Sequence, residues 1–190
     1  LDANLRGRMR NELRAIREQL GVTFVHVTGS ETEALAMGDR VVVLNRGRII
    51  QSGTPGEVYA RPATRFVADF VGESNLLEGH ASGDSAAEVA GLGRIALACA
   101  AGAAGERTTL LLRPEALRVG AEAAALPNRA SGRIVETVFL GLSVKLRLRL
   151  EGGLELLARL PLRPSEPLPA AEGETVPLGF APEDVHVVGR

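Results

Sequence analysis

The sequence has 190 residues, which suits one large domain or two small ones. Hydrophobic residues make up 45% of it and aromatic residues only 3%, so we expect a globular chain with a core of Leu, Val and Ala. A net charge of −1 gives no indication of a nucleic-acid or other polyanionic partner.

The first part of the chain alternates between helix and strand signals. Apolar residues recur at helical spacing from Leu5 to Leu20, and Gly21 is a typical stop. The arginines of this helix lie on another face, which we interpret as solvated rather than as a phosphate site. The β-branched run that follows predicts a buried strand. The predicted elements are a helix over residues 3–20, a strand over 22–28, a helix over 31–37, strands over 41–44 and 48–51, and helices that begin at Thr54 and cover 64–71.

Two of these helices begin with specific capping signals. Ser30 followed by Glu33 has the pattern of an N-cap with a capping box. Residues 54–57, with the sequence TPGE, place threonine at the N-cap, proline at N1 and glutamate at N3. Residues 45–47, with the sequence NRG, predict a hairpin turn between the two short strands. Together these signals indicate an α/β arrangement.

Beyond Gly72 the chain changes to short apolar runs separated by Gly, Pro and charged residues. The clearest run, over residues 144–150, alternates apolar and basic side chains with a strict period of two, and residues 151–153 turn the chain into a return strand. Many short strands at such spacing indicate a small barrel or sandwich. We place the domain boundary near residues 72–76 and expect a loop over the proline-rich residues 162–170. Strands are predicted over 108–113, 132–140, 144–150, 154–160, 176–180 and 185–188.

Residues 1–72 resemble the end of the nucleotide-binding domain of ABC-transporter ATPases of the importer type. The strongest part of the resemblance is residues 20–62, and the motifs follow the order of that family. These motifs are Val27-Thr28, Glu33-Ala34-Leu35, Asp39-Arg40, Gly47-Arg48-Ile49, Gly53-Thr54-Pro55, Tyr59-Ala60-Arg61-Pro62 and the FVADFVG of residues 66–72.

Residues 73–190 resemble the TOBE-type regulatory domain that follows the ATPase domain in importers of sugars, polyamines and related solutes, with the polyamine branch as the nearest. Three motifs carry this resemblance: RPEAL at 113–117, GRIVETVFLG at 132–141 and FAPEDVH at 180–186. Domains of this type are OB-like β-barrels. The expected fold is therefore an α/β remnant of a P-loop ATPase domain over residues 1–72, followed by an all-β OB-like TOBE barrel over residues 73–190.

The resemblance implies the ATP-binding subunit of an ABC solute importer, in which this chain would serve dimerisation and regulation of ATP-driven uptake. Its partners would be a second ATPase subunit, identical or different, and membrane permease subunits. It would lie in the cytoplasm, peripherally on the inner face of the cell membrane. The sequence contains no GxxxxGK[ST] phosphate loop, so ATP and Mg²⁺ are expected only in the full-length protein and the chain by itself should be inactive.

The ends and apolar runs of the sequence fit a piece of a longer protein. Leu1 stands where an initiator Met would be, so we expect the chain to begin within a larger protein. The longest nearly apolar run, residues 95–105, is shorter than the roughly 20 residues that span a bilayer. Any contact with the membrane is therefore expected to run through a partner.

One position departs from the family pattern. Gly29 follows the predicted strand at the place where these ATPases usually carry a switch histidine, and Ser30 stands where aspartate is usual. An imidazole there can donate a hydrogen bond to the developing phosphoryl charge and position the attacking water, and glycine can do neither. The resemblance also places Asp2 at the end of the D-loop, at the subunit interface. We therefore assign Asp2, Gly29 and Ser30 to the nucleotide site or interface, and no catalytic residue to the chain itself.

Two interpretations of Gly29 remain open. In one, the full-length ATPase hydrolyses slowly or pairs with a subunit whose site is intact; in the other, a different group positions the water. His26 lies three residues upstream, roughly 10 Å along a strand and on its opposite face, so we interpret it as a packed strand histidine. The hydroxyl of Ser30 is better suited to cap the following helix than to replace an imidazole.

The remaining candidate side chains favour structural roles. No HxH or HxxxH spacing joins His26, His80 and His186, so a metal site is not favoured and none is assigned. The acidic pair at 183–184 follows a proline and predicts a turn before the last strand. Cys99, the single cysteine, excludes an intrachain disulfide and is expected to be a small core residue.

A rival function is a stand-alone module that binds small oxyanions in the barrel through Arg113 and Arg133. Related domains in oxyanion importers bind small anions, but no anion-specific motif is evident in this sequence. Oligonucleotide binding, which an OB-like barrel can suggest, needs stacking aromatics and a basic groove. Beyond residue 72 the aromatic residues are Phe139 and Phe180, both in apolar strand patterns, so no nucleic-acid partner is expected.

Overall fold

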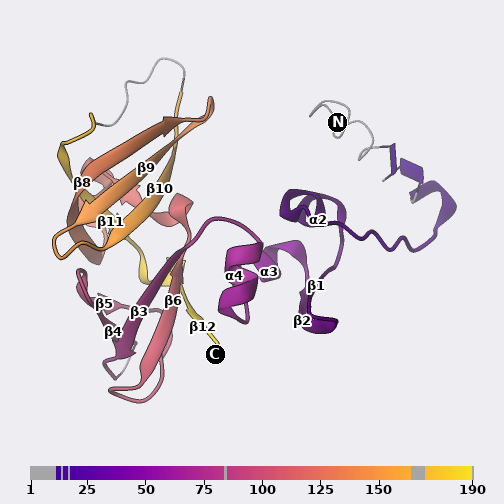
Figure 1. Ribbon diagram of the computed structural model, residues 1–190, viewed down its shortest axis with the longest axis horizontal. Coiled ribbons are helices and arrows are strands. Elements are labelled where there is room, and N and C mark those ends of the chain that lie inside the picture. The colour runs from indigo at the N-terminus through magenta and orange to yellow at the C-terminus, as the bar shows by residue number, and fades with distance from the viewer. Residues whose placement is uncertain (1–11, 14, 17, 84, 164–169, 190) are drawn as a thin grey trace.

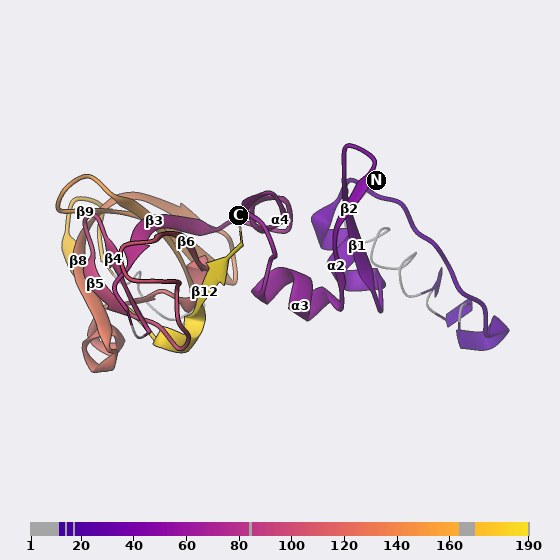
Figure 2. The same cartoon turned by 90° about the horizontal axis from the view of Figure 1, so that it is seen from below.

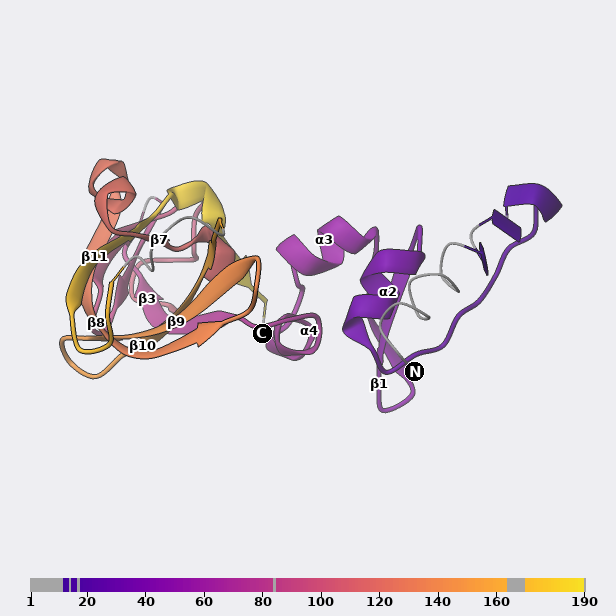
Figure 3. The ribbon, with the colours of Figure 1, turned by 90° about the horizontal axis from the view of Figure 1, so that it is seen from above.

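The computed structural model describes residues 12–13, 15–16, 18–83, 85–163 and 170–189. A small N-terminal part of short helices and one hairpin precedes a larger β-domain (residues 75–188). Figure 1 shows the β-domain at one side, α2 and the β1–β2 hairpin at the other, and α3 and α4 between them, and Figures 2 and 3 show the same order from below and above. Most of the helix predicted over residues 3–20 lies outside the described residues, although those described between 12 and 20 are helical.

The short elements of the N-terminal part follow the predicted capping and turn signals. They are α2 (Glu31–Met37), β1 (Val41–Asn45), β2 (Arg48–Gly53), α3 (Pro55–Ala60) and α4 (Arg65–Phe70). Thr54 caps α3 in a complete capping box with Glu57, as predicted. Arg46 and Gly47 have φ angles of 48° and 74°, the left-handed conformation that a tight hairpin turn requires. These five predicted elements are confirmed.

The strand predicted over residues 22–28 is wrong. The segment is extended, but no strand pairs with it among the described residues. Its side chains are not buried either, since Val25 is 87% exposed and Val27 86% exposed. A strand exists only where a neighbour accepts and donates its backbone hydrogen bonds. The apolar side chains of residues 22–28 therefore favour burial, but no described part of the chain covers them.

The β-domain consists of two five-stranded antiparallel sheets, with strand orders β12-β6-β3-β4-β5 and β10-β9-β8-β11-β7. The strands are β3 (Asn75–Ala81), β4 (Ala86–Val89), β5 (Gly93–Ala96), β6 (Arg107–Leu112), β7 (Arg118–Val119), β8 (Asn128–Phe139), β9 (Ser143–Leu150), β10 (Glu155–Pro161), β11 (Thr175–Phe180) and β12 (Val185–Val188). The connecting 3₁₀ turns are η1 (Pro114–Ala116), η2 (Ala121–Ala125) and η3 (Pro182–Asp184). One core of mainly Leu, Val and Ala side chains joins both sheets, as the composition predicted.

The two sheets are built by the same order of elements. The series β3–β6, η1 and β7 corresponds to the series β8–β11, η3 and β12. In each series the first strand lies at the centre of its sheet, and the last strand crosses to the other sheet, where β7 pairs with β11 and β12 pairs with β6. The registers also correspond, since Asn75 is opposite Leu112 and Asn128 is opposite Phe180. The exchange of the last strands interlocks the two halves.

Two buried asparagines close the β-domain between the sheets. Asn75, at the start of β3, donates to the carbonyl oxygen of Leu157 at 2.9 Å and accepts from its N–H at 2.7 Å. Asn128, at the start of β8, does the same with Ala96, at 3.0 and 2.7 Å. Leu157 lies on edge strand β10 and Ala96 on edge strand β5. Each amide therefore satisfies an edge backbone that would otherwise be unpaired at that residue.

The six strands predicted beyond Gly72 are confirmed within a few residues, whereas β3, β4, β5 and β7 were not predicted. Three of the missed strands have four residues or fewer or are rich in Ala and Gly, which have low strand propensity. Their pairing with stronger strands of the sheet decides their conformation. The predicted loop at 162–170 lies largely outside the described residues.

Candidate functional site

The first candidate site is the corner around Gly29, where the extended segment meets α2. The Ser30 side chain accepts a hydrogen bond from the backbone N–H of Glu33 and caps α2, as predicted, but the predicted capping box is not formed, because the Ser30 N–H donates to Thr28 rather than to Glu33. The Ser30 N–H donates to the Thr28 hydroxyl at 3.0 Å, and that hydroxyl donates to the Glu33 carboxylate at 2.7 Å. Ser30 is therefore held as part of the helix start. Asp2, which was assigned to the same site, lies outside the described residues.

Gly29 itself is not required by the backbone. It does not adopt a left-handed conformation, and a Cβ atom added there would meet no atom within 4 Å. A side chain at this position would therefore extend into open space. The local fold would therefore accept a histidine at position 29 as well as the glycine that the sequence has.

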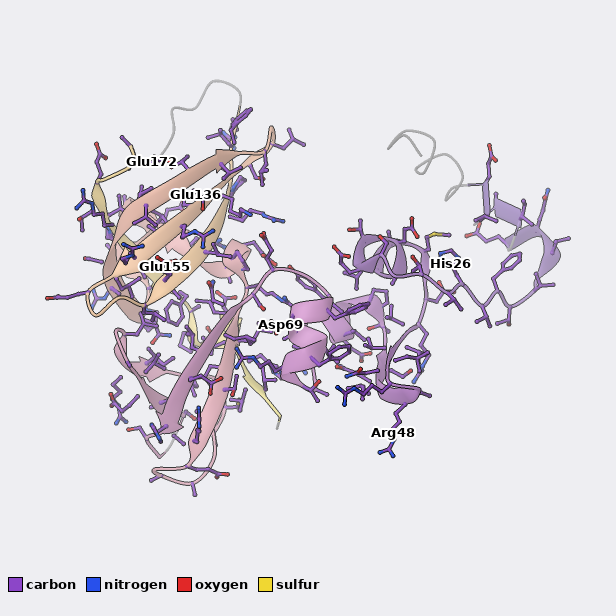
Figure 4. The ribbon with its side chains drawn as sticks, in the orientation of Figure 1. His26, Arg48, Asp69, Glu136, Glu155 and Glu172 are labelled. Atoms are coloured by element: carbon purple, nitrogen blue, oxygen red, sulfur yellow. The ribbon has the colours of Figure 1, made fainter. Side chains whose placement is uncertain are left out.

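His26 is not the packed strand histidine that was predicted. It lies in the extended segment at the end of the molecule opposite the β-domain (Figure 4), and its Nε2 atom is 3.7 Å from a carboxylate oxygen of Glu33. Thr28 contacts the same carboxylate, so His26 and Thr28 lie on one face of the extended segment.

The second candidate site is the junction between the N-terminal part and the β-domain, and Arg113 lies at its centre. Arg113 precedes η1 in the β-domain and is only 7% exposed. Its guanidinium donates to the carbonyl oxygen of Tyr59 at 2.7 Å and to that of Glu73 at 3.0 Å. It also reaches the carbonyl oxygens of Ala68 at 3.2 Å and Gly72 at 3.3 Å. Backbone carbonyls therefore occupy the donors of Arg113 that the rival function would use to bind an anion.

The Tyr59 side chain completes the surroundings of Arg113. The guanidinium carbon lies 4.2 Å from the centroid of the Tyr59 ring, within the range of a cation–π contact. The Tyr59 hydroxyl donates to the Glu115 carboxylate at 2.6 Å. Burial, and then this hydrogen bond, raise the pKa of Tyr59 to about 12, while burial lowers the pKa of Arg113. The RPE motif at 113–115 thus contacts α3 through both its first and its last residue.

Glu73 adds an ionic contact between the junction and the second sheet. Its carboxylate lies 2.8 Å from the ammonium of Lys145 in β9 and 2.6 Å from the guanidinium of Arg159 in β10. The hydrogen bond from Lys145 is the largest influence on the carboxylate and lowers the pKa of Glu73. The segment between α4 and β3 is thus fixed by its backbone to Arg113 and by its side chain to the opposite sheet.

Further contacts extend the junction on both sides. His186 in β12 is half-buried, with its Nε2 atom 3.2 Å from the carbonyl oxygen of Pro62, and burial lowers the pKa of its imidazole. A small apolar cluster packs α4 on the first sheet and contains Ala68, Leu76, Leu111 and Val188.

A cavity of about 330 Å³ lies beside this cluster, with Asp69 of α4 and Glu155 of β10 among its lining residues (Figure 4). The charged side chains of this cavity include Arg65 and Arg147, which form ion pairs with Glu78 and Glu136.

Arg133 lies apart from Arg113, in a shallow cavity of about 640 Å³ on the second sheet. Ser131 and Thr175 contribute hydroxyls to this cavity, but Glu151 and Glu172 line it as well. The carboxylates oppose the binding of an anion. The structure therefore does not bring the two arginines of the rival function into one site.

The remaining candidates form no chemical centre. Cys99 is exposed, contrary to its predicted place in the core. His80 is exposed in β3, and the acidic pair at 183–184 forms η3 before β12, as predicted. Across the described ranges, no group of three or more His, Cys, Asp or Glu side chains is placed to hold a metal ion. No helix in the same part of the chain is long and apolar enough to cross a membrane.

Comparison with known proteins connects both parts of the chain to one class. The sulfate/thiosulfate import ATP-binding protein CysA 2 of Chromobacterium violaceum is 42% identical over 185 residues, which cover 94% of this chain and 49% of that protein. The spermidine/putrescine import ATP-binding protein PotA of Borreliella afzelii is 35% identical over 194 residues, which cover 100% of this chain and 52% of that protein. PotA of Ruegeria pomeroyi is 35% identical over 191 residues, which cover 99% of this chain and 51% of that protein. The chain thus spans about half the length of these relatives.

The β-domain has its own matches. Residues 110–188 match the TOBE domain family. Among solved structures, the chain is similar to the cytoplasmic molybdate-binding protein ModG in a molybdate-bound form, with a TM-score of 0.53 and 14% identity over 61% of this chain and 96% of that one. At this identity the similarity concerns the fold alone, and the β-rich structure is consistent with an OB-like TOBE domain. The chain carries a TOBE domain and is a homologue of the C-terminal half of ABC importer ATP-binding proteins.

Proposed function

We propose that this chain is the C-terminal part of the ATP-binding subunit of an ABC solute importer, and that it serves dimerisation and regulation of ATP-driven uptake. The observation that carries the proposal is the similarity of nearly the whole chain to two kinds of import ATP-binding protein. The names of these relatives differ in solute, sulfate/thiosulfate in one case and spermidine/putrescine in the other. The similarity therefore supports the class of transporter and does not select a solute.

Exposed apolar side chains in the N-terminal part support its assignment to a larger ATPase domain. Phe24 is 50% exposed, Leu44 59% and Ile49 66%, besides the two valines of the extended segment. Such a group of side chains is typical of a surface that another part of a protein covers. We propose that residues 1–72 are the α/β end of a P-loop ATPase domain, and that residues 73–190 form the regulatory TOBE barrel. The core of the β-domain, which has its own apolar cluster, supports this boundary.

The proposed partners follow from the same assignment. They are a second ATPase subunit, identical or different, and membrane permease subunits, and the protein would act on the cytoplasmic face of the membrane. ATP and Mg²⁺ would bind only in the full-length protein, because the chain has no phosphate-binding loop.

Gly29 provides the experiment that tests the proposal. ATP hydrolysis would be measured with the full-length protein and its Gly29→His variant, with Gly56→His in α3 as the control because it too is exposed and uncrowded. If position 29 is the switch position and its side chain limits hydrolysis, Gly29→His should raise turnover by about 10- to 1000-fold, and Gly56→His should not. Normal turnover by the purified Gly29 homodimer would show instead that another group positions the water. Absence of ATP hydrolysis in both the full-length protein and its Gly29→His variant would contradict the proposed class.

The alternative function, binding of a small oxyanion by the β-domain, has weaker support. Arg113 is engaged by carbonyl oxygens, and the cavity at Arg133 contains carboxylates. Isothermal calorimetry of the chain with sulfate, molybdate and spermidine would distinguish the two functions. Binding of either anion that is lost in Arg133→Ala would favour the alternative, and no heat of binding is expected under the main proposal.

A further inference from the structure

The two halves of the β-domain contain the same proline-glutamate turn but differ at the residue before it. Arg113 precedes Pro114-Glu115 after β6, and Ala181 precedes Pro182-Glu183 after β11. The backbone is nearly the same, with φ and ψ of −71° and 143° at Arg113 and −83° and 152° at Ala181. The turn therefore forms with alanine as well as with arginine. The turn alone therefore does not explain why the residue at position 113 is an arginine.

The contacts of the Arg113 guanidinium with two helix ends give the reason. An α-helix leaves its last carbonyl groups without partners inside the helix. Tyr59 is in the last turn of α3 and Ala68 is in the last turn of α4, and Arg113 donates to the carbonyl oxygens of both. A cation is also the favourable charge at the C-terminal end of a helix. One side chain from the β-domain thus completes the ends of two helices that belong to the other part of the chain.

The planar guanidinium suits this position better than another cation would. It carries five N–H donors in a fixed fork. Its Nε and Nη2 atoms reach the carbonyl oxygen of Tyr59, and its Nη1 atom reaches those of Ala68, Gly72 and Glu73. The Tyr59 ring covers one face of the guanidinium and is held by Glu115 from the same turn. All of these contacts would be lost or strained if α3 or α4 moved relative to the β-domain.

We propose that Arg113 is the positioning residue that fixes α3 and α4 to the β-domain, so that the two helices and the β-domain move as one rigid body. A displacement of α3 and α4 would then move the β-domain by the same amount, because the junction between them does not bend. The inference concerns contacts within this chain, and it stands whether or not the proposed transport function is correct.

The test measures the motion between the two parts. Cys99, the single cysteine, is exposed on the β-domain, and Gly56 in α3 can be replaced by cysteine because an added Cβ meets no atom within 4 Å. Spin labels on Cys99 and Gly56→Cys in the whole chain give a distance distribution by double electron–electron resonance. Arg113→Ala is expected to broaden this distribution by about twofold or more, and to raise amide exchange at Ala68 and Val71 by about tenfold or more. Arg113→Lys should be intermediate, since an ammonium keeps the charge but not the fork.

Two further variants make each outcome decisive. Arg118→Ala is the matched control, because Arg118 is exposed and donates to Glu115 within the same turn. Tyr59→Leu removes the covering ring from the helix side and should broaden the distribution without changing exchange in β8 and β9. The proposal is overturned if Arg113→Ala leaves the distribution unchanged, or if Arg118→Ala broadens it equally. It is also overturned if Arg113→Ala abolishes protection in β8 and β9, since the arginine would then serve the fold of the β-domain.

Discussion

At the scale of single residues, the same side-chain type serves different purposes according to its surroundings. Arg113 and Arg133 were grouped by the sequence as possible anion ligands, yet the first is buried among carbonyl oxygens and the second lines an exposed cavity with carboxylates. Asn75 and Asn128 carried no signal in the sequence, and both hold an edge strand. Residue type indicates what a side chain can bind, but the neighbours decide what it does bind.

Replacement of Gly29 by histidine is expected to leave the stability of the chain nearly unchanged. The backbone at position 29 suits any residue, and the added atoms extend into open space. The free energy of unfolding should change by less than about 0.5 kcal/mol, as for other surface substitutions. Urea denaturation of the chain measures this, and a loss above about 2 kcal/mol would show that glycine is needed for the local fold. The result also decides whether the hydrolysis experiment compares equally folded proteins.

Replacement of either buried asparagine by alanine is expected to destabilise the β-domain by about 1–3 kcal/mol. Each substitution leaves the N–H and C=O of an edge residue unpaired, at Leu157 for Asn75→Ala and at Ala96 for Asn128→Ala. Ser131→Ala, at an exposed position of β8, is the control. Denaturant unfolding followed by circular dichroism provides the measurement. Equal midpoints for all three variants would show that water replaces the amides without cost.

At the scale of elements, capping and turn chemistry determined the short helices, whereas the strands depended on their partners. Thr54 and the residues after it specify the start of α3 locally, so that prediction needed no knowledge of the rest of the molecule. The apolar segment at 22–28 has a strong strand sequence but no pairing among the described residues. By contrast, β4 and β5 have weak strand sequences and form through their partners, because β4 pairs with β3 and β5 pairs with β4.

The pairing of β3 and β4 is expected to depend on Gly79. A Cβ atom at this position would lie 2.5 Å from the backbone oxygen of Glu88, and the strands would have to separate to admit it. Gly79→Ala should therefore destabilise the β-domain by about 1–3 kcal/mol or more. Gly56→Ala in α3 is the control, and it should raise stability by about 0.5–1 kcal/mol because position 56 is uncrowded and helical. Thermal unfolding of both variants is the measurement, and a neutral Gly79→Ala would contradict the strand spacing.

At the scale of the whole molecule, the junction joins the N-terminal part to both sheets of the β-domain. Arg113 reaches the helices from the first half, and Glu73 pairs with Lys145 and Arg159 from the second. The interlocked last strands make the two halves a single unit, so a contact with either half is a contact with both. The N-terminal part is thereby attached to the β-domain as a whole.

Stability at the junction is expected to decrease in acid through Glu73. Its pKa is lowered from the usual 4.5 by its two cationic partners, so its contribution to stability is complete above pH 4.5 and is lost as the pH falls through the lower value in the folded protein. The side chain is 39% exposed, so the contribution is limited by solvent to about 1 kcal/mol or less. Denaturant unfolding from about pH 6 to pH 3 should show a shallower decrease for Glu73→Gln than for the wild type. Glu122→Gln, at an exposed position of η2, should behave as the wild type. A decrease for Glu73→Gln as steep as that of the wild type would contradict the assignment.

The sequence by itself determined the features that depend on nearby residues. Capping at Ser30 and Thr54, the turn at 45–47 and the alternating strand over 144–150 all arise from interactions within a few residues, and all are found. Only the tertiary structure decided the purpose of Arg113, Asn75 and Asn128, because their partners are distant in the chain, for example 54 residues away for Arg113 and Tyr59. The repeat within the β-domain was likewise decided by the tertiary structure, because the residues that the two halves share, such as the Pro-Glu turn, become equivalent only when their strands are paired. Local preference sets the short helices and the turns, whereas burial and long-range hydrogen bonding decide which segments become strands and how the elements are joined.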